Sequence, residues 1–316
     1  MKKESILKVG IIGAGLIGRS WAIVFARAGH EVQLWDKDSR VVSGVRDLIA
    51  TQLGVLSQHD LLVDQQATLA RIQVFPEIEA AVDGAGYIQE NLPEKLEIKK
   101  EIFQMLDELC PRETVLASST SSIPASLFSA ALSNRQRCVV AHPVNPPHLI
   151  PLVEVCGAPW TSEQVVQQTI ALMDSIKQRP VLLKKEIEGF VLNRLQGAVL
   201  NEAFKLVKHG YMSVDDVDTT IKDGLGLRWA FMGPFETIDL NAPEGLADYC
   251  RRYGGLYESI AEQQSVVEPW AESLIHDVAA QREQVLPRDQ LQERADWRDT
   301  KLMELVSFKN KANLGK

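Results

Sequence analysis

Hydrophobic and polar positions follow a regular pattern over the first forty residues. A short apolar run at 8–12 predicts a buried strand, and a glycine-rich turn follows it at once. Apolar residues then recur at helical spacing over 21–26, and a second apolar run at 31–35 ends on Asp36. The pattern predicts a strand, a glycine turn, a helix, a second strand and a terminal acid.

Short apolar runs continue to about residue 183, with helix-like stretches between several of them. The runs predict strands at 72–75, 87–89, 114–117, 138–142, 152–156 and 181–183, and helical periodicity covers 96–109 and 161–176. Strands that alternate with helices are typical of an α/β fold with a doubly wound, Rossmann-type parallel sheet. Functional residues of such sheets lie beyond the carboxyl ends of the strands.

The pattern changes at Gly189. An apolar stripe at helical spacing covers 190–207, and Ser213 resembles the start of a helix. Further helical segments are predicted at 244–264, 268–284 and 289–308, and the glycine-punctuated stretch 224–227 predicts a loop. We therefore predict two domains, a Rossmann-type domain at 1–188 and an all-helical domain at 189–316.

The composition is that of an ordinary globular enzyme. The 316 residues carry 34 − 42 = −8 formal charges, with 45% hydrophobic and 24% charged residues. This excludes a disordered chain, a collagen-like fibre and a disulfide-stapled mini-domain. The acidic balance argues against nucleic acid as the main partner, because phosphate binding needs a basic face.

Cysteine usage and apolar runs bear on the compartment. The four cysteines, Cys110, Cys138, Cys156 and Cys250, lack metal-ligand spacing, so we expect buried small apolar side chains and no metal site. The basic start followed by the apolar run 9–17 could mimic a signal peptide, but the glycines inside the run fit a structural turn better. No run of about 18 apolar residues predicts a membrane span, and we expect a cytoplasmic protein.

The glycine turn has the spacing of a dinucleotide-binding motif. It reads Gly13-Ala14-Gly15-Leu16-Ile17-Gly18. The first glycine permits the tight turn, the second lets the backbone approach a pyrophosphate, and the third lets the helix pack closely on the strand. Asp36 lies where a carboxylate binds both ribose hydroxyls and repels a 2′-phosphate, which favours NAD over NADP. Flavin remains possible from the motif alone.

Three further segments carry candidate chemistry for hydride transfer. A predicted strand runs into the hydroxyl-rich loop 118–122, His142 ends another strand, and Glu154 lies inside an apolar run. A carboxylate in a buried strand is costly unless it has a partner, and we predict His142 as that partner. His142 would then take the proton of a secondary alcohol while Glu154 orients the imidazole, and Ser121 and Asn193 would bind the reacting oxygen. Three plainer interpretations stay open: the serines form a turn, the histidine is structural, or Glu154 pairs with an arginine.

Arg228 lies in an apolar setting, between 224–227 and 229–234. One interpretation is an exposed arginine, or one that pairs with Asp223 or Glu236. The other is that its planar guanidinium binds the carboxylate of the substrate through two hydrogen bonds.

The order of these motifs resembles the 3-hydroxyacyl-CoA dehydrogenase superfamily. The motifs are the glycine turn and the segments 119–122, 142–146, 152–155 and 189–194; the segments 142–147, 224–231 and 297–299 are similar to its lambda-crystallin/L-gulonate 3-dehydrogenase branch. The resemblance implies that Ser121, His142, Glu154 and Asn193 are catalytic, and that the NAD contacts are Gly13 to Gly18, Asp36, Glu94, Lys99 and Asn145. It also implies a homodimer formed through the C-terminal helices.

One departure from the family concerns the substrate. CoA-using relatives carry basic contacts after the second strand, whereas residues 41–66 contain no lysine and only Arg46. We therefore predict a small free 3-hydroxy acid, similar to L-gulonate; L-carnitine and an acyl-CoA such as 3-hydroxybutyryl-CoA remain alternatives. A non-catalytic, crystallin-like structural protein is a further alternative, and the presence of all four catalytic positions favours an enzyme.

Overall fold

The short apolar runs form the strands of one sheet in the structure, a computed structural model that describes residues 6–312. The strands are β1 (Lys8–Ile12), β2 (Glu31–Trp35), β3 (Ile72–Phe75), β4 (Tyr87–Glu90), β5 (Val115–Ser118), β6 (Cys138–Pro143), β7 (Leu152–Gly157) and β8 (Arg179–Leu183). Every predicted strand is present, and its ends differ from the predicted ends by two residues at most. The strand predictions are therefore confirmed.

Helices connect most of these strands. They are α1 (Leu16–Arg27), α2 (Ser39–Gln58), α3 (Gln65–Ala70), α4 (Ile78–Val82), α5 (Leu96–Leu109), α6 (Ala125–Ser129), the 3-10 turn η1 (Arg135–Arg137), α7 (Glu163–Ser175) and, after β8, α8 (Leu192–Lys208). Side chains cap two of the longer ones: Asp38 accepts the backbone N–H of Arg40 at the start of α2, and Ser162 accepts that of Val165 at the start of α7. Such caps satisfy N–H groups that lack a partner within the helix.

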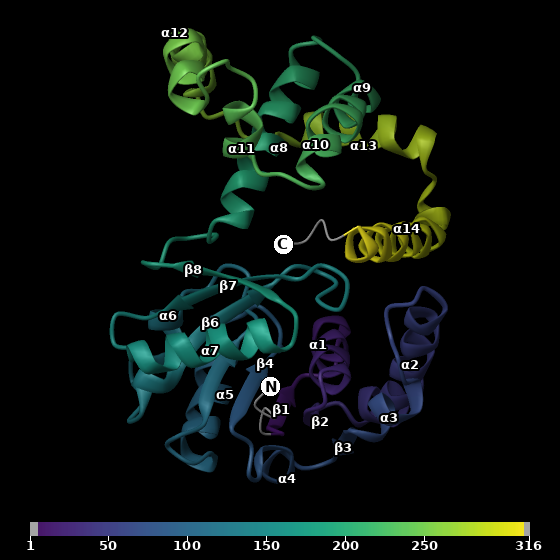
Figure 1. The fold of residues 1–316 in the computed structure, drawn as a ribbon, viewed down its shortest axis with the longest axis vertical. Coiled ribbons are helices and arrows are strands. Elements are labelled where there is room, and N and C mark those ends of the chain that lie inside the picture. Colours follow the sequence, from purple (N-terminus) through teal and green to yellow (C-terminus); the bar gives the residue numbers. More distant parts are fainter. Residues whose placement is uncertain (1–5, 313–316) are drawn as a thin grey trace. The chain divides into compact units, whose positions relative to one another are not determined.

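The sheet has the strand order β3-β2-β1-β4-β5-β6-β7-β8 (Figure 1). It is parallel from β3 to β6, which agrees with the predicted doubly wound fold. The last two strands depart from this parallel arrangement, because β7 pairs antiparallel with β6 and β8 runs parallel to β7. The segment 144–151 between β6 and β7 is too short for the crossover that a parallel pair needs.

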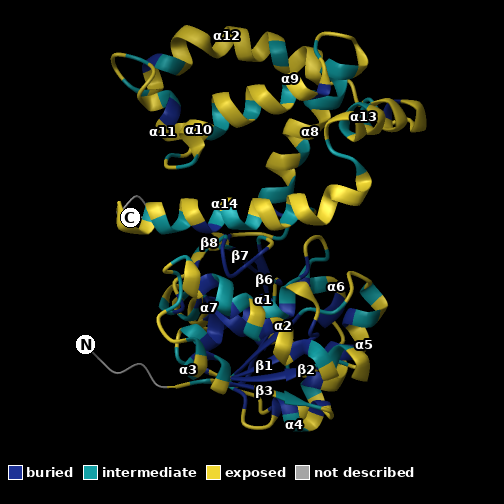
Figure 2. Ribbon diagram, turned by 90° about the vertical axis from the view of Figure 1, so that its right-hand side faces the viewer, coloured by how far each residue is buried: buried dark blue, intermediate teal, exposed yellow. Residues whose placement is uncertain are grey.

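Alternate residues of the central strands face different helices. Ile88, Leu116 and Val140 belong to one buried apolar cluster with side chains of α4, α5 and α6. The neighbouring position Tyr87 packs instead on Phe25 of α1, with ring centroids 5.9 Å apart. Because strand side chains alternate between the two faces, the sheet is covered on both sides. Figure 2 shows the strands as the most buried part of residues 6–194.

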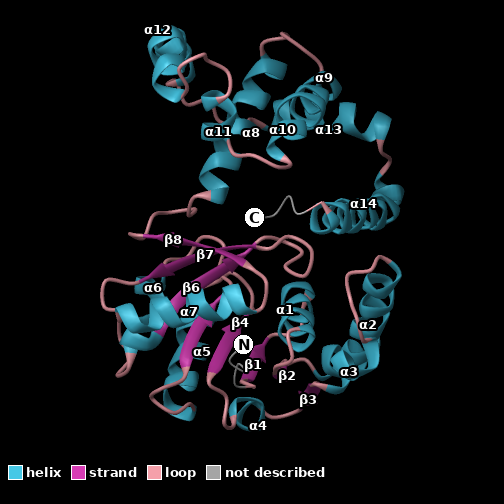
Figure 3. Cartoon of the chain, viewed as in Figure 1, coloured by secondary structure: helices cyan, strands magenta, loops and turns pink. Residues whose placement is uncertain are grey.

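The chain divides into two compact units, Met1–Arg194 and Leu195–Lys316, called unit 1 and unit 2 below. All described strands lie in unit 1, and the described part of unit 2 is helical (Figure 3). The division falls within α8, whereas the predicted domain boundary at 188–189 lies just before that helix. The site described below is built entirely within unit 1.

Unit 2 contains the rest of α8 and the C-terminal helices. These are α9 (Val214–Thr219), the π-helix η2 (Thr220–Leu225), α10 (Gly226–Trp229), α11 (Pro234–Asp239), α12 (Leu246–Gln264), α13 (Glu272–Val285), η3 (Arg288–Gln290) and α14 (Leu291–Lys311). The long helices agree with the predicted segments. Within residues 6–312 no helix combines the length and apolar character needed to cross a membrane.

The prediction of a loop at 224–227 is wrong. These residues continue a helix, because η2 ends at Leu225 and α10 begins at Gly226. A Cβ atom at Gly226 would lie 2.9 Å from the carbonyl oxygen of Ile221, one wide turn earlier. Glycine therefore serves close packing inside a π-type turn here, and a turn signal from glycine alone misled the prediction.

The cysteine prediction holds for three residues and is wrong for the fourth. Cys110, Cys138 and Cys156 are free and buried, and burial raises the pKa of Cys110 to about 11 and those of Cys138 and Cys156 to about 12. Cys250 is free but exposed on α12. Helical spacing predicts that α12 has an apolar stripe, but it does not predict whether another part of the same chain covers that stripe and Cys250.

Candidate active site

The glycine turn after β1 leaves open space at Gly15, at the start of α1. Gly13 has a left-handed φ of 99°, and its N–H donates to the carbonyl oxygen of Trp35 at 2.8 Å. A Cβ at Gly18 would lie 1.8 Å from the carbonyl oxygen of Gly13, so α1 packs directly on the turn. A Cβ at Gly15 would meet nothing within 4 Å, and no side chain caps the first N–H groups of α1. Free N–H groups facing open space suit a pyrophosphate.

Asp36 is fixed beside this turn. One carboxylate oxygen accepts the backbone N–H of Ala14 at 2.8 Å, and the other accepts that of Asp38 at 2.9 Å. The side chain is only half-buried, so its remaining lone pairs can accept ribose hydroxyls. A fixed negative charge at this place repels a 2′-phosphate.

His142 and Glu154 are direct cross-strand neighbours in the antiparallel pair β6–β7. The Nδ1 atom of His142 lies 2.9 Å from Oε2 of Glu154, and the two residues are 4% and 2% exposed. The imidazole also packs on the ring of Phe190, with centroids 5.4 Å apart. The structure thus brings together the pair predicted from sequence, and no arginine within residues 6–312 binds Glu154.

The other oxygen of Glu154 is held by the start of α8. Gly189 and Phe190 both have positive φ angles, 73° and 49°, and turn the chain so that the next two backbone amides point at Glu154. The N–H groups of Val191 and Leu192 donate to Oε1 at 2.9 and 3.0 Å. A carboxylate at a helix N-terminus is favoured by the helix dipole.

These contacts determine the protonation of the pair. Burial by itself would raise the pKa of Glu154, but the hydrogen bonds from His142, Leu192 and Val191 outweigh it and hold the pKa below its usual value. Glu154 is therefore an ionised acceptor, and Nδ1 of His142 carries the hydrogen between them. The Nε2 atom is then an acceptor, and within residues 6–312 no hydrogen bond to it is found.

The hydroxyl loop after β5 offers one free hydroxyl group. Its other four hydroxyls donate to carboxylate or amide oxygens: Ser118 to Glu90 (2.6 Å), Ser119 to Asn91 (2.7 Å), and Thr120 and Ser122 to Glu94 (2.6 and 3.0 Å). Ser121 is exposed, and its hydroxyl has no hydrogen-bond partner in the described part of the chain. The Nδ2 atom of Asn193 donates to the carbonyl oxygen of Ser121 at 2.8 Å. The structure therefore places Ser121 and Asn193 together.

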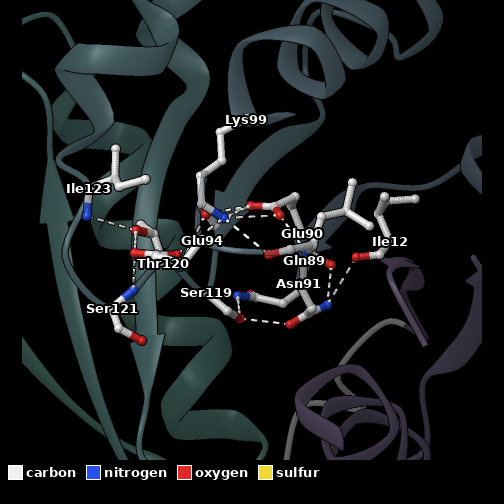
Figure 4. Close-up of polar contacts among 12 residues, drawn as sticks. Ile12, Gln89, Glu90, Asn91, Glu94, Lys99, Ser119, Thr120, Ser121 and Ile123 are labelled. Carbon is white, nitrogen blue, oxygen red and sulfur yellow. Dashed lines mark hydrogen bonds and ion pairs between the residues drawn. The ribbon is translucent and has the colours of Figure 1, made fainter. Parts of the chain in front are cut away.

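Glu94 lies beside this loop, and Lys99 lies next to Glu94 (Figure 4). Oε1 of Glu94 accepts the backbone N–H groups of Ser121 and Ser122, both at 2.9 Å. Lys99 is 1% exposed, and its ammonium group binds Glu90 at 3.0 Å. Sequence reasoning missed Glu90, although a carboxylate at the end of a buried strand is the signal that identified Glu154.

Two further predicted residues are exposed. Asn145 is exposed in the segment 144–151 that follows β6. Arg228 is exposed on α10 in unit 2, and in the described residues neither Asp223 nor Glu236 pairs with it; Asp223 pairs with Lys222. The roles of both residues stay predictions.

The family models match both parts of the chain. The NAD-binding domain of 3-hydroxyacyl-CoA dehydrogenase matches residues 8–187, and the C-terminal domain of the same family matches residues 189–284. The chain belongs to the 3-hydroxyacyl-CoA dehydrogenase family. It is an NAD-dependent oxidoreductase of that family, and NAD, the cofactor that the glycine turn and Asp36 predicted, is confirmed.

Named relatives refine the placement within the family. The chain is 40% identical over 307 residues to the lambda-crystallin homolog of Rattus norvegicus, covering 96% of each protein. It is 38% identical over 242 residues to L-carnitine dehydrogenase of Streptomyces griseus, covering 77% of this chain and 72% of that protein. A solved structure of 5-formyl-3-hydroxy-2-methylpyridine 4-carboxylic acid 5-dehydrogenase, described as an NAD⁺-dependent dismutase, has a TM-score of 0.83 and 27% identity and covers 96% of this chain and 98% of its own. The predicted lambda-crystallin branch is thereby confirmed.

Proposed function

We propose that this dehydrogenase oxidises the 3-hydroxyl group of a small free 3-hydroxy acid of the L-gulonate type to the 3-keto acid. The observation that carries the proposal is the buried His142–Glu154 pair at 2.9 Å, in the same unit as the free hydroxyl of Ser121. NAD, when bound, would supply the hydride acceptor for the alcohol carbon. The chain itself has to take the hydroxyl proton and hold the oxygen.

The role of each residue follows from the donors and acceptors that its contacts within the chain leave unused. Nε2 of His142 takes the proton, and Glu154 stabilises the imidazolium that forms. The Ser121 hydroxyl donates to the reacting oxygen. Asn193 uses one amide hydrogen on the Ser121 carbonyl, and its second hydrogen is left for the same substrate oxygen.

A free acid fits better than an acyl-CoA. Arg46, the only arginine or lysine of 41–66, donates to the carbonyl oxygen of Ile72 and so links α2 to β3. The relatives named for L-carnitine and for a pyridine carboxylic acid also support a small free acid. L-Carnitine and 3-hydroxybutyryl-CoA are the alternatives. Arg228 is the proposed ligand of the substrate carboxylate.

The function is tested by following NADH absorbance with L-gulonate, L-carnitine, 3-hydroxybutyrate and 3-hydroxybutyryl-CoA. We expect the highest kcat/KM with a free acid, with L-gulonate first. A higher kcat/KM for the CoA ester would contradict the free-acid proposal. Failure of all four substrates, with NAD still bound, would favour the crystallin-like structural alternative.

The same proposal includes a homodimer formed by unit 2. In the described residues of this unit only Val214, Leu274 and Met303 are buried among the hydrophobic side chains, and α8 buries none. Helices with so few buried apolar residues have no core of their own and need a partner surface. We expect sedimentation equilibrium to give about twice the chain mass of 35.1 kDa at micromolar concentration. A mass of one chain would remove this part of the proposal.

A further inference from the structure

His148 anchors the segment 144–151, which joins β6 to β7, to the helix α1. Its Nδ1 atom lies 3.0 Å from Oγ of Ser20, and its backbone carbonyl oxygen accepts a hydrogen bond from Nη1 of Arg27 at 2.8 Å. Ser20 and Arg27 are about two turns apart on α1, so both side chains lie on the same face of the helix. One residue of the segment is thus held at two points by one helix.

The hydroxyl group of Ser20 determines which nitrogen of His148 carries the hydrogen. That hydroxyl donates its single hydrogen to the carbonyl oxygen of Leu16, in the first turn of α1, at 2.9 Å. Ser20 can therefore only accept from His148, so Nδ1 of the imidazole is the donor. A continuous chain of hydrogen bonds then runs from the segment 144–151 to the turn of α1 that contains the last glycine of the motif, Gly18.

Only one of the two anchoring groups is charged. Burial, and after it the charge of Arg27, lowers the pKa of His148 to about 4, so the imidazole is neutral at neutral pH. Burial also lowers the pKa of Arg27, to about 10, and the guanidinium group stays protonated. Within residues 6–312 no carboxylate pairs with Arg27, but the helix dipole favours a cation in the last turn of α1. The anchoring therefore does not change near neutral pH.

The anchored part of the segment is buried, whereas Asn145 beside it is exposed. Residues 146–149 are buried, and the carbonyl oxygen of Pro146 accepts the backbone N–H groups of Leu149 and Ile150, both at 3.0 Å. Asn145 immediately precedes this turn. Because the turn is held on α1, the anchoring determines where the amide of Asn145 lies.

The place of β6 in the sheet indicates which half of NAD this amide can reach. A dinucleotide binds where the strand order reverses, and in this sheet that point lies between β1 and β4. Asp36 follows β2, on one side of this point, and is the expected ligand of the adenosine ribose. β6 lies on the other side, beyond β4 and β5. A group that follows β6 is therefore expected at the nicotinamide half.

We propose that His148 and Arg27 are positioning residues, which hold the segment 144–151 on α1 and so place the Asn145 amide at the nicotinamide half of NAD. The inference rests on the predicted contact of Asn145 with the cofactor, and it does not depend on which substrate is oxidised. Neither His148 nor Arg27 touches NAD in this proposal. His142 has contacts of its own with Glu154, so the anchoring should affect cofactor binding more than the base.

Calorimetric titration with NAD and with ADP-ribose, which lacks the nicotinamide ring, tests the inference. His148→Phe removes the donor to Ser20 and keeps a ring, and Arg27→Met removes the donor to the His148 carbonyl. We expect each to raise the Kd of NAD about 3- to 10-fold, as for the loss of one hydrogen bond, and to leave the Kd of ADP-ribose within about twofold. In an Asn145→Ala background the same replacements should change the Kd of NAD by less than about twofold, because the group that they position is absent.

Two kinds of control separate positioning from loss of stability. His148→Asn and Arg27→Lys each keep a donor, so both should leave the Kd of NAD within about twofold of that of the unmutated enzyme. His30 is another buried histidine, 7% exposed, whose Nδ1 accepts the backbone N–H of Leu7 at 3.2 Å, before the amino end of β2. His30→Phe should lower the melting temperature as His148→Phe does and leave both Kd values unchanged. If His148→Phe does not fold, Arg27→Met and Arg27→Lys carry the test.

Four results would overturn the inference. The first is an unchanged Kd of NAD in both His148→Phe and Arg27→Met. The second is an equal rise for NAD and ADP-ribose, which would mean that the anchoring shapes α1 as a whole. The third is an undiminished rise in the Asn145→Ala background, and the fourth is an unchanged Kd of NAD in Asn145→Ala itself. Since binding is measured without turnover, each of these results is independent of whether the proposed substrate is oxidised.

Discussion

Replacement of His142 by alanine is expected to lower kcat by about 10²–10⁴-fold and to leave the Kd of NAD nearly unchanged. The buried carboxylate of Glu154 holds Nδ1 of the imidazole at 2.9 Å, and this leaves Nε2 as a free acceptor for the substrate proton. His142 lies on β6, whereas the glycine turn that we expect to bind the cofactor follows β1. The measurement is steady-state oxidation of the best substrate, with NAD binding followed by fluorescence.

Glu154→Gln should lower kcat nearly as much as His142→Ala does. Oε1 accepts two backbone N–H groups, so the amide oxygen of glutamine must take that place. The amide NH₂ group then faces Nδ1 of His142, which has to accept, and the imidazole hydrogen moves to Nε2. The base is lost although the side chain keeps its size, as for a triad carboxylate replaced by its amide.

A second histidine–glutamate pair provides the control. His209 and Glu268 lie 3.1 Å apart on the surface of unit 2, and the His209 side chain is 50% exposed. His209→Ala should leave kcat unchanged. Near-normal turnover by His142→Ala would show that another group is the base.

The sequence predicted the elements of unit 1 well because apolar runs and turn residues act locally. It also predicted the contact between His142 and Glu154, because a buried carboxylate needs a partner. The antiparallel pairing that makes them cross-strand neighbours was not predicted. The antiparallel direction of β7 and β8 relative to the other strands follows from the short segment 144–151. The pattern of apolar runs located these strands but did not indicate their direction.

Other parts of the site could not be predicted from local pattern. Glu90 and Lys99 form an ion pair because β4 and α5 pack together. The spacing of apolar residues does not predict which side chain fills the space between the end of a strand and a helix. The left-handed backbone of Phe190 has no sequence signal of its own, since bulky residues avoid it. In unit 2 the helical spacing located the helices, but it does not say what covers their apolar stripes.

Arg228→Met is expected to raise the KM of the acid substrate at least roughly tenfold and to leave the Kd of NAD unchanged, because a charge-assisted hydrogen bond is worth about 1.5–3 kcal/mol. Arg228 is an exposed cation that no carboxylate of the described chain neutralises, in a setting where Trp229 and Phe231 are also exposed. Arg228→Lys should fail to restore the low KM, since an ammonium group cannot form the paired hydrogen bonds of a guanidinium.

Two comparisons decide what Arg228 recognises. Arg288→Met removes an equally basic side chain that pairs with Glu283 on the same unit, and it should leave KM unchanged. The second comparison uses 3-hydroxybutyryl-CoA, whose acyl group has no free carboxylate. If Arg228 binds the carboxylate, the rise in KM for the free acid should be absent for this ester; a similar rise for both substrates would mean that Arg228 stabilises unit 2 or contacts another part of the substrate.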